Sequence, residues 1–125
     1  MTKAKTQIGQ EGEKLASEYL RQKGLKIIEK NWRGRWGEID LIARDGQKIF
    51  FIEVKTRHSQ SFGLGLDAVD ARKQAKIAKT ALLYLQKHPK DYEDIRLAVL
   101  SIDYDKSSQA IQFVEFPLDG MGRYY

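Results

Sequence analysis

The stretch GEIDLIARDGQKIFFIEVKTR, from Gly37 to Arg57, decides the fold that we expect for this chain. Its two halves, EIDLIAR and KIFFIEVKT, are rich in β-branched and aromatic residues, which favour strands. Between them stands Asp45-Gly46, one of the strongest short signals for a two-residue hairpin turn. The stretch therefore predicts two adjacent antiparallel strands.

The position of the turn fixes which side chains share a face of this hairpin. A turn at 45–46 places Asp40 opposite Phe51, so that Glu53 is the diagonal neighbour of Asp40, about 7–8 Å away at the backbone. Glu38 then lies opposite Glu53. One predicted face carries Glu38, Asp40, Phe51, Glu53 and Lys55. The other carries Ile39, Leu41, Phe50, Ile52 and Val54.

Two interpretations fit this group of charges. The carboxylates and the lysine can be polar residues on the wet face of a sheet, where ion pairs contribute little to stability. Outside the charged positions, however, the strands are apolar on both faces, which indicates burial on both sides. Like charges in a partly buried site are costly unless a cation offsets them. We therefore expect Asp40 and Glu53 to hold one divalent cation.

The chemistry of such a site follows from its donor atoms. Mg²⁺ and Mn²⁺ favour carboxylate oxygens, and a substrate phosphate can complete the coordination shell of Mg²⁺. Lys55 lies two residues after Glu53 on the same predicted face, where it can steer the attacking water or offset charge in the transition state. The set is suited to phosphodiester hydrolysis.

The rest of the chain predicts a single α/β domain around the hairpin. Apolar residues at helical spacing predict helices at 8–23 and 67–87, ended by Gly24 and Pro89. Further strands are predicted at 25–32, 95–103 and 110–116. The order α-β-β-β-α-β-β indicates a central mixed five-stranded sheet with helices on both faces. The domain spans 1–125, with a core at 8–116 and a mobile tail at 117–125.

Composition narrows the setting in which the protein works. The chain has no cysteine, which excludes disulfides and thiolate sites. It has no apolar run typical of a signal peptide or a membrane span, so we expect a cytoplasmic protein without a membrane partner. The net charge of +5 favours a polyanionic partner such as nucleic acid. A basic surface that serves only solubility would carry the same charge.

Several motifs in this order resemble those of a known family. GQEGEKLASEYL, GEIDLIA and FIEVKTR, followed by the helix ARKQAKIAKTALLYL, are similar to motifs of the YraN-like family of uncharacterised bacterial proteins. That family is itself similar to archaeal Holliday-junction resolvases, within the PD-(D/E)xK superfamily of nucleases. The resemblance covers about 8–116 and implies a restriction-endonuclease-like fold.

The resemblance also implies roles for particular residues. The implied metal ligands are Asp40, Glu53 and Glu13, with a catalytic lysine at Lys55. Glu13 lies at the edge of the apolar stripe of its helix, a position that also suits a solvated glutamate. Glu38 is a further supporting candidate.

The chain matches the family pattern at Gln74 and departs from it at two other places. Related nucleases use a glutamine at the position of Gln74 to orient the site, and its place on the apolar side of the helix calls for a buried partner. Ile39 stands where the superfamily carries its proline. Leu97-Ala98 replaces a frequent Phe-Asp, so no acid comes from that strand position.

A second group of residues suits a nucleic-acid backbone. The predicted contacts are Arg33, Arg35, Arg57, Arg72, Lys73, Lys76 and Lys79. Arg72, Lys76 and Lys79 form a ridge on the second helix, with Lys73 beside them. The expected core stripe of this helix is Ala71, Ala75, Ala78, Leu82 and Leu85. A solvated helix face explains the ridge equally well. Trp32 and Trp36 alternate with the arginines and suit base stacking, strand-end packing or a dimer contact. His58 follows the lysine motif and is assigned to a loop, with a proton shuttle as the alternative.

Two functions follow from these observations. The first is a metal-dependent endonuclease that cleaves structured, branched or single-stranded DNA. The second is a non-catalytic nucleic-acid-binding module of a repair, recombination or uptake complex. The complete Asp-Glu-Lys set favours the nuclease. A homodimer is expected if both strands of a branched duplex are cut, because that requires two sites related by symmetry.

Overall fold

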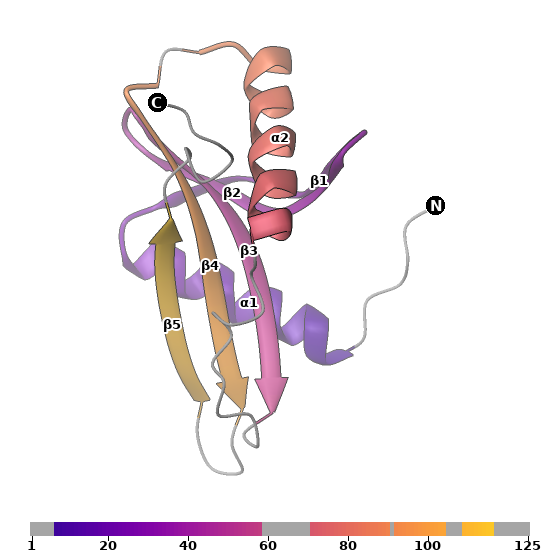
Figure 1. The fold of residues 1–125 in the computed structure, drawn as a ribbon. Helices are drawn as coiled ribbons and strands as arrows, with labels where there is room; N and C mark the ends of the chain where they lie inside the picture. Colours follow the sequence, from indigo (N-terminus) through magenta and orange to yellow (C-terminus); the bar gives the residue numbers. More distant parts are fainter. Residues whose placement is uncertain (1–6, 59–70, 91, 105–108, 117–125) are drawn as a thin grey trace.

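The computed structural model describes residues 7–58, 71–90, 92–104 and 109–116 (Figure 1). In this part of the chain the elements are α1 (Gln7–Gln22), β1 (Lys26–Gly34), β2 (Gly37–Asp45), β3 (Lys48–His58), α2 (Ala71–Lys87), β4 (Asp94–Tyr104) and β5 (Gln109–Phe116). Their order confirms the predicted α/β arrangement. The predicted mobile tail at 117–125 and the predicted helix start at 67–70 lie outside the described residues.

The strands form one mixed sheet in the order β1-β2-β3-β4-β5. β3 and β4 are parallel, and the other neighbouring pairs are antiparallel. α2 lies between β3 and β4 in the chain, as the crossover of a parallel pair requires. Figure 1 shows α2 in front of the sheet and α1 behind it, which confirms the prediction of helices on both faces. Neither described helix is long and apolar enough to cross a membrane.

Two apolar layers hold the helices to the sheet. On the α1 side the buried residues are Ala16, Leu20, Leu25, Leu41, Ala43, Phe50, Ile52, Ala98, Leu100 and Ile102. On the α2 side they are Ile39, Ile42, Ile49, Phe51, Ile77, Ala78, Ala81, Tyr84 and Leu97. Neighbouring residues of β3 therefore alternate between two cores, which explains why the sequence of this strand is apolar on both parities.

The β2–β3 turn lies one residue later than predicted. Asp45 pairs with Lys48, so the two turn residues are Gly46 and Gln47, and Gly46 has φ +63°. A glycine with positive φ at the first central position is typical of a type II′ hairpin turn. The predicted pairing of Asp40 with Phe51 is therefore wrong, since Phe51 pairs with Ile42. The predicted pairing of Glu38 with Glu53 is wrong as well, because the ladder ends at Leu41–Ile52. A turn one residue later moves the partner of each paired β2 residue by two positions along β3, so each still shares a face with the β3 residues predicted for it.

Ile39 lies on the other side of the sheet from the one predicted. We expected it beside Leu41, but it packs in the α2-side core. The regular alternation of β2 breaks at Asp40, where pairing with β3 ends after Leu41–Ile52. Across from this point β1 is irregular as well, because Asn31 has φ +54°. A left-handed residue turns the chain locally and changes which side chains reach each face.

The buried face of α2 is rotated from the predicted stripe. Leu82, predicted to be in the core, is 41% exposed, whereas Ile77, Ala81 and Tyr84 are buried. Tyr84 packs edge-on against Phe51 at 5.8 Å between ring centroids, and against Trp32 at 5.2 Å. Burying the large Tyr84 ring gains more free energy than burying Leu82 at the edge of the helix face, so Tyr84 sets the rotation of the helix.

α1 is fixed against the sheet near both ends. Gly24 has φ +91°, and Leu25 N–H donates a hydrogen bond of 2.9 Å to the Leu20 carbonyl, as in a Schellman cap. Near the other end, a Cβ on Gly12 would lie 2.3 Å from Thr56 Cγ2. The first half of α1 therefore approaches β3 more closely than a larger residue would allow.

We expect Gly12→Ala to lower the free energy of unfolding by about 1–3 kcal/mol, because overpacking against Thr56 exceeds the gain of about 1 kcal/mol in helix propensity. Urea denaturation measures the change. Thr56→Ser removes the clashing methyl group, so the double variant should recover most of the loss. A more stable Gly12→Ala protein would show that the helix does not approach β3 this closely.

Candidate functional site

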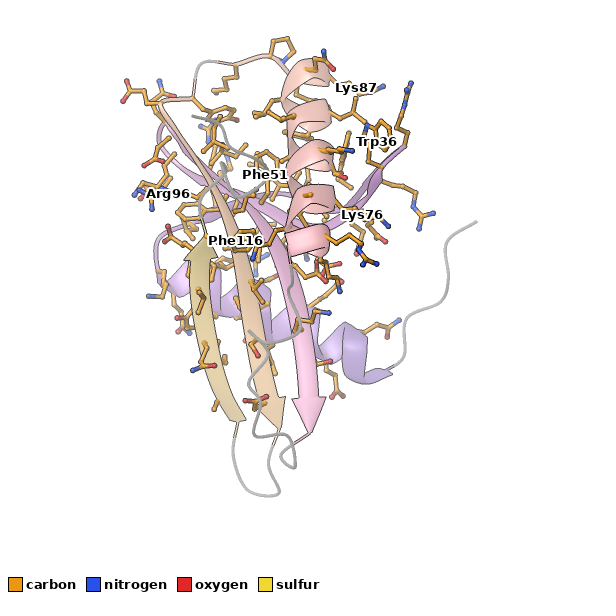
Figure 2. All side chains as sticks on the ribbon, viewed as in Figure 1. Trp36, Phe51, Lys76, Lys87, Arg96 and Phe116 are labelled. Carbon is orange, nitrogen blue, oxygen red and sulfur yellow. The ribbon has the colours of Figure 1, made fainter. Side chains whose placement is uncertain are left out.

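A polar cleft lies between α2 and the β2–β3 half of the sheet. Its volume is about 300 Å³, and its lining residues are Trp36, Gly37, Glu38, Asp40, Glu53, Lys73, Lys76, Ile77 and Thr80. Three predicted site carboxylates, Glu38, Asp40 and Glu53, thus face one cavity. Figure 2 shows Trp36 and Lys76 on the same side of α2. We refer to this cavity as the α2 cleft.

Asp40 is held in place by the backbone of β3. Val54 N–H donates a hydrogen bond of 2.8 Å to Asp40 Oδ2. The backbones of β2 and β3 stop pairing after Leu41–Ile52. Beyond this point the Asp40 side chain, in place of the β2 backbone, accepts the hydrogen bond from β3. The interaction fixes the position of the Asp40 carboxylate beside Glu53, on the next strand.

Glu53 is paired with two lysines from different elements. Its Oε2 lies 3.5 Å from Lys55 Nζ on β3 and 3.3 Å from Lys73 Nζ on α2. The predicted closeness of Glu53 and Lys55 is therefore present. Lys73 was predicted as a nucleic-acid contact. Its partly exposed side chain instead places the ammonium group beside the Glu53 carboxylate.

The two lysines titrate differently because of what surrounds them. Burial, followed by the neighbouring Lys73 side chain, lowers the pKa of Lys55, against the opposing effect of Glu53. The neighbouring Lys55 side chain, followed by the carboxylates of Glu53 and Asp40, raises the pKa of Lys73 against the effect of burial. The surroundings therefore favour the charged form of Lys73 and disfavour that of Lys55.

The donor set in the cleft suits a hard divalent cation. Asp40 and Glu53 supply carboxylate oxygens, and no histidine is among the described lining residues. Two carboxylates are enough for Mg²⁺, which keeps several waters when it binds to proteins. Nowhere in the described ranges do three or more acidic or histidine side chains gather in a group that could hold a metal. The chemistry of the two carboxylates suits Mg²⁺, and in the described ranges no third acidic or histidine ligand joins them.

Glu13 does not join this group. It lies on α1, where it lines a different pocket with Ser17 and Lys30, and one of its carboxylate oxygens accepts a hydrogen bond of 3.4 Å from Asn31. α1 covers the face of the sheet opposite to α2 (Figure 1). The structure thus brings two of the three implied metal ligands together and leaves the third on the other helix.

The remaining predicted residues are distributed around the cleft. Glu38 pairs with Arg33 at 3.6 Å, and Gln74 is half-buried on the same helix face as Ala78. Exposed basic side chains of the predicted set are Arg33, Arg35, Arg72, Lys76 and Lys79. His58, assigned to a loop from the sequence, is instead the last residue of β3, where it pairs with Tyr104. The side chains of Arg57 and His58 lie outside the described residues, as does that of Ala71.

Sequence reasoning missed two kinds of polar group near the site. Thr80 lines the α2 cleft, and its hydroxyl donates to the Lys76 carbonyl at 2.9 Å. Ser101 pairs in register with Lys55, and its buried Oγ makes no hydrogen bond within the part of the chain that the structure describes. The available signal was a serine within the otherwise apolar stretch LAVLSI, residues 97–102.

Comparison with known proteins places the chain in a family. Residues 12–102 match the model of the family described as Uncharacterised protein family UPF0102. The chain belongs to the UPF0102 family. The matched region contains every described residue that lines the α2 cleft, and it confirms the family-level part of the resemblance seen in the motifs.

Individual relatives of this UPF0102 chain agree over most of their length. A UPF0102 protein of Thermodesulfovibrio yellowstonii is 47% identical over 109 residues, which is 87% of this chain and 96% of the relative. A UPF0102 protein of Syntrophomonas wolfei is 41% identical, and the match covers 86% of this chain and 94% of the relative. A UPF0102 protein of Nocardia farcinica is 44% identical, and the match covers 78% of this chain and 77% of the relative.

The hydrogen bond between Val54 and Asp40 can be tested apart from any activity. Asp40→Asn keeps a side-chain oxygen as acceptor, so we expect a free energy of unfolding close to that of the original protein. Asp40→Ala leaves the Val54 N–H without this partner and should cost about 1–3 kcal/mol. Urea denaturation of both variants makes the comparison. Equal losses in the two variants would argue against the hydrogen bond as the anchor of Asp40.

Proposed function

We propose that this protein is a metal-dependent endonuclease that hydrolyses phosphodiester bonds in structured, branched or single-stranded DNA. The observation that carries the proposal is the meeting of Asp40 and Glu53 in one cleft, with the Lys55 ammonium 3.5 Å from Glu53. One or two carboxylates can hold a Mg²⁺ ion against a substrate phosphate, and a lysine beside them can offset charge in the transition state.

The topology supports the same proposal by analogy. A mixed sheet carries the acid on one strand and the Glu-x-Lys pair on the next, with a helix on each face. This arrangement resembles that of restriction-endonuclease-like proteins of the PD-(D/E)xK superfamily. We propose that the chain has that fold, with Mg²⁺ or Mn²⁺ as cofactor. Fold likeness alone does not assign chemistry, so the site must be tested directly.

In this proposal the work of hydrolysis is divided between residues that line the cleft and Lys55, which pairs with the cleft residue Glu53. A divalent cation bound by Asp40 and Glu53 would supply Lewis-acid stabilisation of charge on the phosphate. The Val54 N–H keeps the Asp40 carboxylate oriented, and Lys73 offsets the repulsion between the two acids. Lys55 is placed to donate a hydrogen bond to a phosphate oxygen as negative charge develops there. The exposed lysines of α2 hold the flanking phosphates.

A second candidate is a nucleic-acid-binding module without catalysis. The observation that favours it is the pairing of Glu53 with two lysines, since a carboxylate engaged by two ammonium groups is a weaker ligand for a cation. In either function we propose a cytoplasmic protein that binds nucleic acid, with a homodimer where two strands are cut.

Cleavage assays separate the two candidates. We expect the protein to cut at least one of a labelled four-way junction, a flap, a single strand and a plain duplex when Mg²⁺ or Mn²⁺ is present. Asp40→Asn should abolish cleavage, and Lys55→Ala should slow it by about 100-fold or more. Mn²⁺ should also raise the melting temperature of the original protein, and raise that of Asp40→Asn less.

A matched control uses a carboxylate outside the cleft. Glu11→Gln removes an exposed acid on α1 and should cut DNA at the original rate. Binding of these substrates without cleavage in any protein, and no Mn²⁺ effect on melting, would refute the nuclease proposal and leave the binding module.

Both candidate functions, the nuclease and the binding module, predict that exposed lysines of α2 contact phosphates. Each of Lys76→Ala and Lys79→Ala should reduce the slope of log K against log salt concentration by about 0.7–0.9, because each removes one phosphate contact. Fluorescence anisotropy of a labelled oligonucleotide at several salt concentrations measures the slope. Lys14→Ala, at an exposed position on α1, is the control and should leave it unchanged.

A further inference from the structure

Trp36 is exposed at the rim of the α2 cleft. Its side chain is 47% exposed, and among the described residues the only other large apolar side chain in this condition is Leu82 at 41%. The second tryptophan, Trp32, is instead packed edge-on against Tyr84. Nearly half of this indole is thus exposed at the rim of the cleft, where a planar ligand that covered it would gain from the burial.

The backbone holds Trp36 in a fixed place. Arg35 and Trp36 form the two-residue turn between Gly34 and Gly37, which pair with each other at the end of the β1–β2 ladder. A Cβ at Gly34 would lie 2.8 Å from a methyl carbon of Leu83, so the hairpin end rests directly on α2. An aromatic side chain on such a support loses little further freedom when a ligand stacks on it.

Cations surround the indole ring. Lys79 Nζ lies 4.9 Å from its centroid and Arg35 Cζ lies 6.0 Å away. Lys76 lines the α2 cleft with Trp36, and Figure 2 shows these two side chains on the same side of α2. A planar apolar ring among positive charges matches the chemistry of single-stranded nucleic acid, in which bases alternate with phosphates.

Trp36 also connects two hollows of the surface. It lines the α2 cleft together with Asp40 and Glu53, and it lines a second hollow beside Leu82 and Gln86. A base seated against this ring would therefore continue along the chain into the cleft that holds the carboxylates. A second copy of this chain fits the surface less well, because a symmetric contact would bring Lys79 and Arg35 of both copies together.

We propose that Trp36 stacks on an unpaired base, and that Lys76, Lys79 and Arg35 hold the adjoining phosphates. The substrate class is then DNA with unpaired nucleotides beside the bond to be cut, such as a flap, a fork or a single strand. The inference rests on the proposed function for what happens in the cleft. Stacking itself requires no metal and no catalysis.

Fluorescence of Trp36 tests the stacking. Trp32→Phe keeps a ring against Tyr84 and leaves Trp36 as the single tryptophan of the chain. In EDTA, titration with oligo-dT should quench its fluorescence to saturation, whereas an abasic oligonucleotide with the same number of phosphates should quench it little. Equal quenching by both would overturn the proposal. So would a spectrum that changes with protein concentration alone, because the ring would then lie between two copies.

Affinity measurements test the same point without altering Trp32. By anisotropy in EDTA, Trp36→Ala should bind labelled oligo-dT about 5- to 100-fold more weakly, and Trp36→Phe should stay within about threefold of the original protein. Both variants should bind blunt duplex DNA nearly as the original does. A ribo-oligonucleotide of the same length shows whether the surface distinguishes RNA. An unchanged affinity of Trp36→Ala for oligo-dT would refute the inference.

Cleavage distinguishes this inference from the proposed function. If the protein cuts flap and blunt duplex equally well and Trp36→Ala cuts both at the original rates, the nuclease proposal stands and the stacking inference fails. If no substrate is cut but oligo-dT quenches Trp36 and the abasic strand does not, the nuclease proposal fails and the stacking surface stands.

Discussion

One hydrogen bond, from the Val54 N–H to the Asp40 carboxylate, connects β2 and β3 at the point where their ladder ends. Beyond it the strands separate, and the space between them and α2 becomes the cleft. The same bond brings an acid of β2 beside Glu53 of β3. A side-chain carboxylate thus accepts the hydrogen bond that a backbone carbonyl of β2 would accept in a continued ladder. The position of Asp40 in the site depends on this hydrogen bond. If the ladder continued, the two carboxylates would be ordinary members of a covered sheet.

α2 contributes charge to the site as well as apolar packing. Its buried residues, Ile77, Ala81 and Tyr84, fix the rotation that turns Lys73 towards Glu53 and leaves Lys76 and Lys79 in water. Different faces of one helix therefore pack in the core, supply a counter-charge to Glu53 and form a basic surface. This arrangement explains how two acids tolerate each other in a partly buried place, because Lys73 lowers the cost of their repulsion.

The sequence was sufficient where local pattern decides structure and insufficient where packing decides it. The strands, both described helices and their order followed from alternation, helical spacing and the positions of glycine and proline. The closeness of Asp40, Glu53 and Lys55 followed from an even-length turn. The turn itself was misplaced by one residue because Asp45-Gly46 and Gly46-Gln47 are both acceptable turn pairs. Ile39 was misassigned because the alternation of β2 breaks beside Asp40, and Leu82 because burial of Tyr84 sets the rotation of α2. The pairing of Lys73 with Glu53 joins two elements whose relative rotation has no sequence signal.

The parallel pairing of β3 with β4 also bears on the order in which the chain folds. The hairpin of β2 and β3 joins near neighbours, whereas Lys48 of β3 pairs with Asp94, far along the chain. Loop closure makes such distant pairing slow, so we expect the hairpin to form first and the crossover helix to dock later. Asp40 and Glu53 would then meet while water still screens their charges. Lys73 would arrive together with the apolar cover, so that the acids are never buried without a counter-ion.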